Sequence, residues 1–219
     1  MDLSSTSPGF ILTLVIGLAL APFVAVMVTS FTKIIVVLSL LRSALGLQQT
    51  PPNVVLNGLA IILSFYVMNP VALQVAEAVT KSGTPISQVN DINRLVALVD
   101  VGKEPVRNFL VKYTTPKERA FFLRTARVSL PEDKRSLVTE RDFVVLIPAF
   151  TVSELTDAFK IGFLIFLPFL VIDMIVSNIL MAMGMMMLSP TTISLPFKLL
   201  LFVLLDGWAR LVHGLVLTY

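Results

Sequence analysis

The sequence predicts an all-α fold in which hydrophobic helical hairpins flank a polar helical insert. Two observations support this prediction. First, 56% of the 219 residues are hydrophobic and only 14% are charged, and the mean hydropathy of +0.88 is far above that of a soluble globular domain. Second, the charged residues are concentrated in the middle of the chain. We therefore expect much of the surface to meet lipid or other protein.

The distribution of charge divides the chain into three parts. Residues 1–76 contain few charges, residues 77–142 contain most of them, and residues 143–219 are hydrophobic again. This pattern indicates an N-terminal hydrophobic hairpin, a polar extramembrane insert and a C-terminal hydrophobic hairpin. The net charge of +3 gives no indication of nucleic-acid binding, and the absence of cysteine excludes disulfides and thiolate metal sites.

The first hydrophobic run, Phe10–Val28, contains no charge and is long enough to cross a bilayer, which takes about 20 apolar residues. The residues before it include Asp2 but no Lys or Arg, and the run is longer than the core of a signal peptide. We interpret it as a retained helix, with a kink at Pro22.

Residues 29–53 carry Lys33 and Arg42 without an acidic neighbour, which favours a cytoplasmic loop by the positive-inside rule. The sequence Thr-Pro-Pro-Asn at 50–53 is a helix-start signal. The apolar run that follows, Val54–Val79, contains Pro70 and would return the chain across the membrane. The insert at 77–142 would then lie outside the cytoplasm.

The insert is expected to be helical. Four apolar residues follow the i, i+3, i+4, i+7 spacing of a buried helical face: Val106, Phe109, Leu110 and Tyr113. The sequence TPKE at 115–118 is a capping box that opens a second helix, whose Phe121, Phe122 and Leu123 could pack inward. Acidic and basic residues alternate through 129–142, so this segment is predicted to be a solvated loop rather than a basic patch.

The C-terminal part is predicted to begin a helix at Ser153 as N-cap. Glu154 would lie in the first turn, and Asp157 could pair with Lys160. The apolar run Ile161–Leu188 would be about 42 Å long as one helix, longer than the hydrocarbon core of about 30 Å. It must therefore tilt, kink at its proline, or project from the membrane.

A turn at 189–194 and one last helix at 195–219 would complete the C-terminal hairpin. Its helices contain four ionisable residues, which at membrane depth usually face protein or water: Asp173, Lys198, Asp206 and Arg210. Asp206 and Arg210 are spaced to pair on one helix. Folding the hairpin about Thr191 places Asp173 near Arg210 and leaves Lys198 without a partner in its own hairpin. Two interpretations of Lys198 stay open: pairing with a neighbouring subunit, or snorkelling to an interface.

Three stretches resemble one known family, the FliP/SctR proteins of type III secretion systems. They are PAFTVSELTDAFKIG at 148–162, PFKLLLFVLLDGW at 196–208 and LLRSALGLQQTPPNVVLNGLA at 40–60. With their hydrophobic continuations they cover about 28–72 and 143–215. The insert matches the family in length and character but less in motif.

The resemblance implies a role as well as a fold. Family members assemble as about five copies, a homo-pentamer, with the S and T export-apparatus proteins, and the assembly works with the U and V proteins. The resulting helical export gate lies in the bacterial inner membrane, with much of it on the periplasmic side, and unfolded secreted proteins pass through its central pore. The hydrophobic hairpins then face protein more than lipid. The lack of a signal peptide resembles the virulence-associated injectisome branch.

The sequence MAMGMMMLSP at 181–190 holds five of the nine methionines. Successive helical residues are about 100° apart, so Met185, Met186 and Met187 can point one way only if the helix frays into a loop. Gly184 before them and Ser189-Pro190 after them favour this. From the residues alone, ordinary apolar packing is the alternative. The family resemblance implies a methionine gasket at these three residues, with Met181 and Met183 left as packing residues.

The sequence does not favour an enzyme, a cofactor or a metal site. His213 is the only histidine, and neither a P-loop nor a Rossmann glycine pattern is present. Two other function classes are a solute transporter subunit and a membrane-anchored periplasmic sensor. The chain lacks the inverted repeat of many transporters and a cytoplasmic signalling region, so both are weaker than the export gate.

Overall fold

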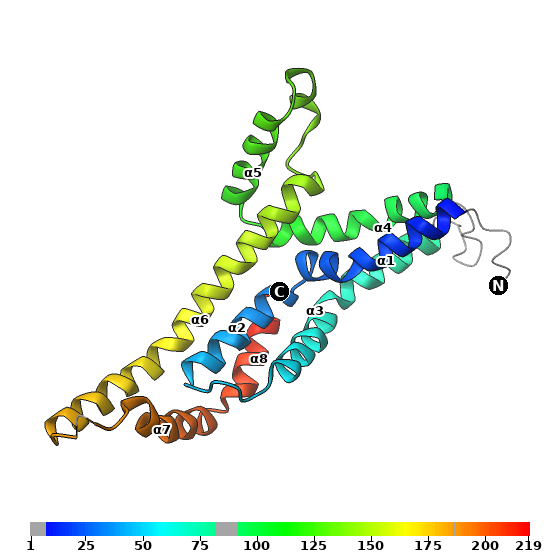
Figure 1. Ribbon diagram of the computed structural model, residues 1–219. Helices are drawn as coiled ribbons and strands as arrows, with labels where there is room; N and C mark the ends of the chain where they lie inside the picture. The colour runs from blue at the N-terminus through cyan, green and yellow to red at the C-terminus, as the bar shows by residue number, and fades with distance from the viewer. Residues whose placement is uncertain (1–7, 82–91, 186) are drawn as a thin grey trace. The chain divides into compact units, whose positions relative to one another are not determined.

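The computed structural model describes residues 8–81, 92–185 and 187–219, and Figure 1 shows that these residues form helices and connecting segments without a strand. The α-helices are α1 (Pro8–Val28), α2 (Phe31–Ala44), α3 (Asn53–Lys81), α4 (Ile92–Tyr113), α5 (Pro116–Ser129), α6 (Phe143–Ala182), α7 (Pro190–Leu204) and α8 (Gly207–Leu217), with a 3-10 helix, η3 (Glu132–Leu137), between α5 and α6. The predicted all-α class is confirmed.

The chain packs as two units. Unit 1 comprises residues 1–30 and 68–154, and unit 2 comprises residues 31–67 and 155–219, so that α3 and α6 contribute to both. The packed units therefore differ from the hydrophobic and polar parts of the sequence, because the first hydrophobic helix belongs to the same unit as the polar insert.

Helix α2 forms the centre of unit 2. Its apolar residues at helical spacing are completely or almost completely buried: Ile34, Val37, Leu38 and Leu41. They pack with Leu56 of α3, Ala158 of α6 and Leu215 of α8. The expected cytoplasmic loop is thus wrong over most of its length. Lys33 is buried as well, with its Nζ 3.9 Å from the centre of the Tyr219 ring.

The end of α2 is specified by a glycine. Gly46 has φ +77°, its N–H donates to Ser43 O, and Leu47 N–H donates to Arg42 O. This is a Schellman motif, in which a left-handed glycine closes the helix. Arg42 then donates to Asn53 Oδ1 at 2.6 Å, and α3 begins at Asn53 as predicted.

In unit 1, α4 packs against the first turns of α6. Phe109 and Leu110 are buried and Tyr113 is half-buried, which confirms the predicted apolar face. The Phe109 and Phe150 rings lie 5.7 Å apart, a favourable distance for a tilted aromatic pair.

Helix α5 begins at Pro116 as predicted, but the predicted capping-box hydrogen bond is not formed. Instead, the Thr115 N–H donates to Ser153 Oγ at 3.1 Å. Phe121 is 58% exposed and only Phe122 and Leu123 are half-buried, so the inward packing predicted for the three is wrong at Phe121.

Helix α6 begins ten residues before the predicted Ser153. The carbonyl of Asp142 accepts a hydrogen bond from Leu146 N–H at 2.8 Å, while its carboxylate accepts one from Thr139 N–H at 2.8 Å. Ser153 and Glu154 lie within α6 and are buried. The predicted N-cap failed because the helix already begins at Phe143. Val145 and Leu146, which precede Ser153, are buried within unit 1 and extend the helix backwards.

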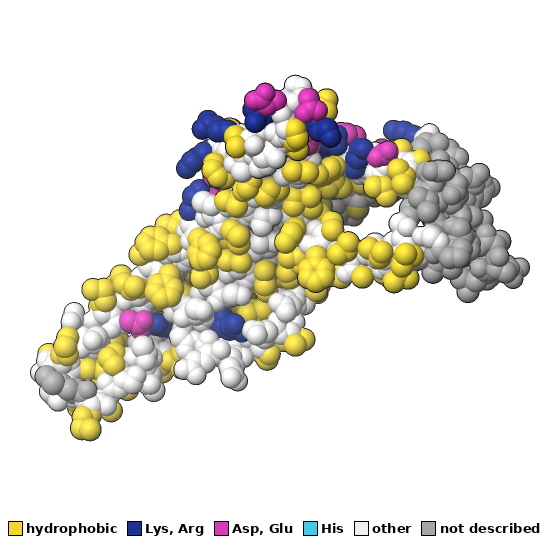
Figure 2. Space-filling model, turned by 45° about the horizontal axis from the view of Figure 1, so that its top comes forward, with side chains coloured by type: hydrophobic (Ala, Val, Ile, Leu, Met, Phe, Trp, Pro, Cys, Tyr) yellow, Lys and Arg dark blue, Asp and Glu magenta, His cyan; other side chains and the backbone are white. Residues whose placement is uncertain are grey.

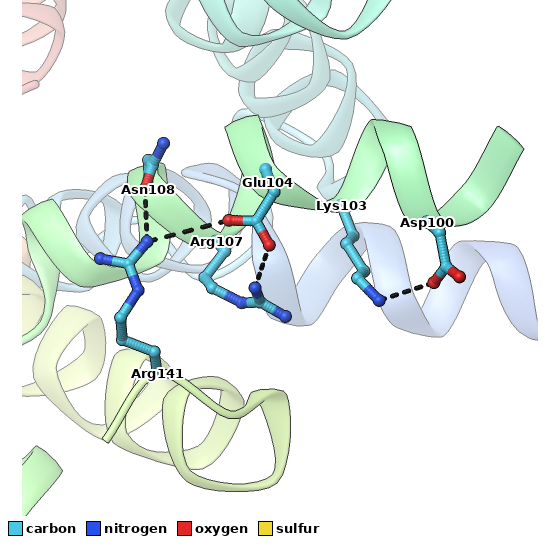
Figure 3. A network of polar contacts seen from close by, with 6 residues as sticks. All are labelled: Asp100, Lys103, Glu104, Arg107, Asn108 and Arg141. Atoms are coloured by element: carbon cyan, nitrogen blue, oxygen red, sulfur yellow. Dashed lines mark hydrogen bonds and ion pairs between the residues drawn. The ribbon is translucent and has the colours of Figure 1, made fainter. Parts of the chain in front are cut away.

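An ion-pair network joins α4 to the segment before α6 (Figure 3). Lys103 Nζ lies 2.6 Å from Asp100 Oδ1, and Glu104 pairs with Arg107 of the same helix. Arg141 lies 3.8 Å from Glu104 and donates to Asn108 Oδ1 at 2.8 Å. In Figure 2 the charged side chains gather over α5 and the segment that follows it. The segment 129–142 is mostly exposed, as its mixture of acidic and basic residues predicted.

Two helices of the described residues, α3 and α6, are long and apolar enough to cross a membrane. The count rises to four if two further pairs of helices, α1 with α2 and α7 with α8, are each one broken span.

Candidate functional site

The connection between α6 and α7 carries the methionine run. Helix α6 ends at Ala182, and Gly184 has φ +73°. Gly184 N–H donates to Met181 O at 3.0 Å, and Met185 N–H donates to Leu180 O at 2.9 Å. These bonds form a second Schellman motif. The prediction that the helix gives way to a loop before Ser189-Pro190 is confirmed. Helix α6 ends six residues before Leu188, the end of the predicted apolar run.

The described methionine side chains of this connection are exposed. Met185 is 42% exposed and Met187 is fully exposed, while Met186 lies outside the described residues. Met181 and Met183, expected to be packing residues, are also more than half exposed. We define the methionine loop as residues 183–189. Contiguous exposed apolar side chains usually mark a surface that another molecule covers.

Helix α7 begins at Pro190, with Ser189 as its N-cap residue. The predicted turn at 189–194 is therefore wrong, since these residues form the cap and the first turn of α7. Pro is favoured at the first helical position because its missing N–H would have no intrahelical partner there. Ser189-Pro190 was interpreted as the end of one helix, although the same two residues also form the start of the next.

Below the methionine loop, a buried polar cluster joins the two arms of the hairpin. Lys198 Nζ of α7 lies 2.6 Å from Asp173 Oδ2 of α6. Ser194, one turn before Lys198, donates to Asp173 Oδ1 at 2.5 Å. Lys198 is 3% exposed and Ser194 is completely buried. We call these three residues the hairpin clamp.

The hairpin clamp also reaches α2. Lys198 Nζ donates to Ala44 O at 3.2 Å, and Ala44 is the last residue of α2. The carbonyls of a final helical turn lack intrahelical partners and carry the negative end of the helix dipole. Lys198 therefore satisfies an orphan carbonyl of α2 while it neutralises Asp173, and so holds three helices together.

The expectation that Lys198 has no partner in its own hairpin is wrong. It depended on a fold about Thr191, whereas the left-handed Gly184 reverses the chain earlier. The midpoint between Asp173 and Lys198 along the chain falls within the methionine run. Asp173 therefore faces Lys198 and not Arg210, and the methionine loop lies at the tip of the hairpin.

The expected pair of Asp206 and Arg210 is not formed within the described residues. The last hydrophobic segment breaks at Asp206, which has φ +50°, into α7 and α8 with an angle of 61° between them. At Gly207 a Cβ atom would lie 2.2 Å from the Phe202 ring, so this close approach requires glycine. The single last helix predicted from the sequence is wrong for this reason.

The remaining candidate residues lie on α6 and α8. Lys160 Nζ lies 2.9 Å from Asp157 Oδ1 on the surface of α6, which is the pairing suggested by their spacing. Glu154 is buried. His213 is exposed on α8. Within the described ranges no three His, Cys, Asp or Glu residues are grouped as metal ligands.

Sequence reasoning missed two members of the cluster below the loop, Ser194 and the carbonyl of Ala44. Ser194 lies four residues before Lys198, on the same helical face, which was a usable signal. The carbonyl had no side-chain signal, because any residue at the end of α2 would present it.

Comparisons with known proteins point in one direction. The model of the FliP family matches residues 14–215. The hypersensitivity response secretion protein HrcR of Ralstonia nicotianae is 48% identical over 214 residues, covering 95% of this chain and 96% of that protein. The Yop proteins translocation protein R of Yersinia pestis is 52% identical over 202 residues, 92% of each chain. The flagellar biosynthetic protein FliP of Pectobacterium carotovorum is 46% identical over 208 residues, 95% of this chain and 77% of that protein.

Proposed function

The chain belongs to the FliP family, and we propose that it is a core subunit of a type III secretion export gate whose methionine loop lines the central pore. Its relatives are named as secretion, translocation and flagellar biosynthetic proteins. A role in protein export follows from this family membership. None of these three names indicates a solute transporter or a sensor.

The observation that carries the pore role is the exposed methionine loop at the tip of a clamped hairpin. A loop of apolar side chains exposed to water is unfavourable, so several copies gain free energy by bringing their loops together. The hairpin clamp holds the two arms together about 14 Å before the end of α6, since Ala182 lies nine residues after Asp173. Three helices hold the base through Lys198, and in the loop the Leu188 N–H donates to Met185 O at 3.3 Å.

Methionine is suited to a pore that is closed at rest and opens when a protein chain passes through it. Its side chain has three rotatable bonds and a polarisable sulfur, so it repacks around irregular shapes at little cost. A ring of Met185, Met186 and Met187 from several copies would exclude hydrated ions at rest. It would give way to an unfolded chain of varied sequence during export.

The proposed assembly follows the family. About five copies would join with the S and T proteins, and with the U and V proteins, in the bacterial inner membrane. Much of the assembled complex would lie on the periplasmic side. The exposed apolar side chains of α1, α3 and α6 would be covered in that complex by other subunits. The injectisome branch is the one we propose for this chain.

Ion conductance tests the pore role. We expect replacement of Met185, Met186 and Met187 together by Ala to make the purified complex conduct small ions in planar bilayers, because the ring loses its bulk. Native gels would verify that the variant complex still assembles. Conductance equal to that of the parent in an assembled complex would remove the pore role of the loop.

Met174→Ala is the matched control. Met174 is 58% exposed on α6, in the same hairpin but away from its tip. It removes the same side chain without altering the proposed ring, so the complex should stay closed. A leak in both variants would attribute the effect to loosened packing of the hairpin.

A further inference from the structure

Unit 2 contains a groove that the proposed pore role does not use. The cavity has a volume of about 470 Å³, within the range of small-molecule clefts, about 300–1,000 Å³. Its walls come from α2, α6, α7 and α8 and are almost entirely apolar, with Leu41, Ile165, Phe169, Phe202 and Leu211 among the lining residues. An apolar groove of this volume can hold a hydrocarbon chain.

One charged residue lies at this groove. Arg210 is exposed and lines the cavity together with the apolar side chains. Asp206, one turn before it, does not pair with it, and within the described ranges no acidic side chain lies within ion-pair distance of Arg210. A guanidinium binds a phosphate group well, because its fixed fork of donors matches two phosphate oxygens.

A glycine keeps one wall of the groove open. Gly214 lies in α8, one turn after Arg210, and lines the same cavity. A Cβ atom at Gly214 would meet no atom within 4 Å, so its absence is not needed for helix packing. Gly lowers helix stability relative to other residues. The space over Gly214 is continuous with the apolar groove.

We propose that this groove binds an anionic phospholipid, with one acyl chain along the apolar walls and the phosphate group on Arg210. Charge complementarity selects this occupant over a neutral lipid or an apolar helix, because only an anionic head group would neutralise Arg210. Two of the walls belong to the α7 and α8 pair, which has the composition of a broken membrane span. The proposal does not depend on the pore role of the methionine loop.

Lipid retention by the purified full-length assembly is the test. The assembly is delipidated and incubated with equal amounts of dioleoyl phosphatidylglycerol and dioleoyl phosphatidylcholine, and bound lipid is measured by native mass spectrometry. We expect about fivefold more phosphatidylglycerol, the factor for one basic contact near an anionic surface. Equal retention of the two lipids by the parent would overturn the proposal.

Two variants separate the parts of the site. Arg210→Gln should abolish the preference for phosphatidylglycerol while both lipids still bind. Gly214→Leu should lower the retention of both lipids alike, because the side chain fills the groove. Leu is a better helix former than Gly and has room at this position, so the variant should fold. Unchanged retention in either variant would contradict the assignment.

Lys160→Gln is the matched control. Lys160 is an exposed cation of unit 2 that pairs with Asp157 and does not line the groove, so its removal should leave lipid retention unchanged. A loss of preference equal to that of Arg210→Gln would show general surface electrostatics and refute a local site.

Other occupants have their own signatures. If inorganic phosphate at millimolar concentration displaces the lipid, the site recognises free phosphate and the acyl-chain assignment fails. The chain has no cysteine, so Gly214→Cys gives a single reporter for maleimide labelling. We expect phosphatidylglycerol to slow its labelling. Protection in the delipidated assembly that lipid does not change would mean that another subunit covers the groove, which would also overturn the proposal.

Discussion

Two Lys–Asp pairs of equal length lie in surroundings that differ greatly. In unit 2, Lys198 and Asp173 are 2.6 Å apart with side chains 4% and 29% exposed. In unit 1, Lys103 and Asp100 are also 2.6 Å apart, but their side chains are 37% and 57% exposed. The distance between the charges therefore does not distinguish the two pairs.

The surroundings decide what each pair does. An exposed pair is screened by water and salt, and i, i+3 or i, i+4 pairs contribute only about 0.2–0.5 kcal/mol. A buried pair can contribute little net stability compared with apolar residues, but removal of one partner leaves a buried charge and costs about 3–5 kcal/mol. We infer that the clamp residues Lys198 and Asp173 specify the register of the α6–α7 hairpin, whereas the α4 pairs keep a helix solvated.

The largest effect is expected for Lys198→Met. Met has nearly the shape of the Lys stem, so the change removes the charge without a large cavity. It leaves Asp173 and the Ala44 carbonyl without their partner, and we expect a loss of about 3 kcal/mol in the free energy of unfolding, at the low end of the range because Asp173 is partly exposed.

Trp208 makes this prediction measurable. It is the only tryptophan, and its ring lies 5.6 Å from that of Phe202 in the core of unit 2. Its fluorescence during denaturant unfolding of the purified protein therefore reports on unit 2. A loss below about 1 kcal/mol, the level of a surface pair, would mean that the two pairs do not differ as argued.

Removal of the second charge should restore part of the lost free energy of unfolding. We expect addition of Asp173→Asn to Lys198→Met to recover about 1–2 kcal/mol, because the buried charge is gone while the Asn oxygen still accepts from Ser194. The double-mutant cycle, followed by Trp208 fluorescence, measures the coupling between the two residues. Additive losses would show that they are not coupled.

The Glu104 network tests the exposed side of the comparison. Glu104→Gln weakens the contacts to both Arg107 and Arg141, and we expect a loss of about 0.5–1 kcal/mol, measured as faster amide hydrogen exchange in α4. The difference from the parent should shrink in 1 M salt, where the Debye length is about 3 Å. A loss that salt does not change would indicate a less accessible network than its exposure implies.

The smallest effect is expected for Lys103→Met, the exposed counterpart of the first variant. It removes a pair of the same length and should cost at most about 0.5 kcal/mol in the stability of α4. Hydrogen exchange of the α4 amides measures this loss directly. A cost similar to that of Lys198→Met would contradict the claim that burial, rather than distance, separates the two pairs.

Local signals in the sequence predicted where most helices lie, and several of them held. The Pro-Pro-Asn start of α3, the Thr-Pro start of α5 and the glycine within the methionine loop each act through neighbouring backbone groups. The failures also have a local cause. Ser153 and Glu154 have the composition of a helix start, yet buried residues before them extend α6 backwards to Phe143, and propensity is a weak prior against such packing.

The methionine loop could be found from the sequence, but the hairpin clamp could not. A run of methionines after glycine and before Ser-Pro is visible in the residue order. The partner of Lys198 depends on the residue about which the hairpin reverses, and an error of a few residues there moved every predicted contact between its arms. The predicted Asp206–Arg210 ion pair is not formed because the helix breaks at Asp206.

The sequence by itself determined the helical class, the family, the polar insert and the methionine run after α6, because composition, periodicity and capping act over a few neighbouring residues. Only the tertiary structure decided which charges meet, that the supposed loop at 31–44 is the buried centre of unit 2, and that Arg210 lines an apolar groove. These features depend on how segments far apart in the chain pack against one another, and packing is set by the sum of many small contacts that no single stretch contains.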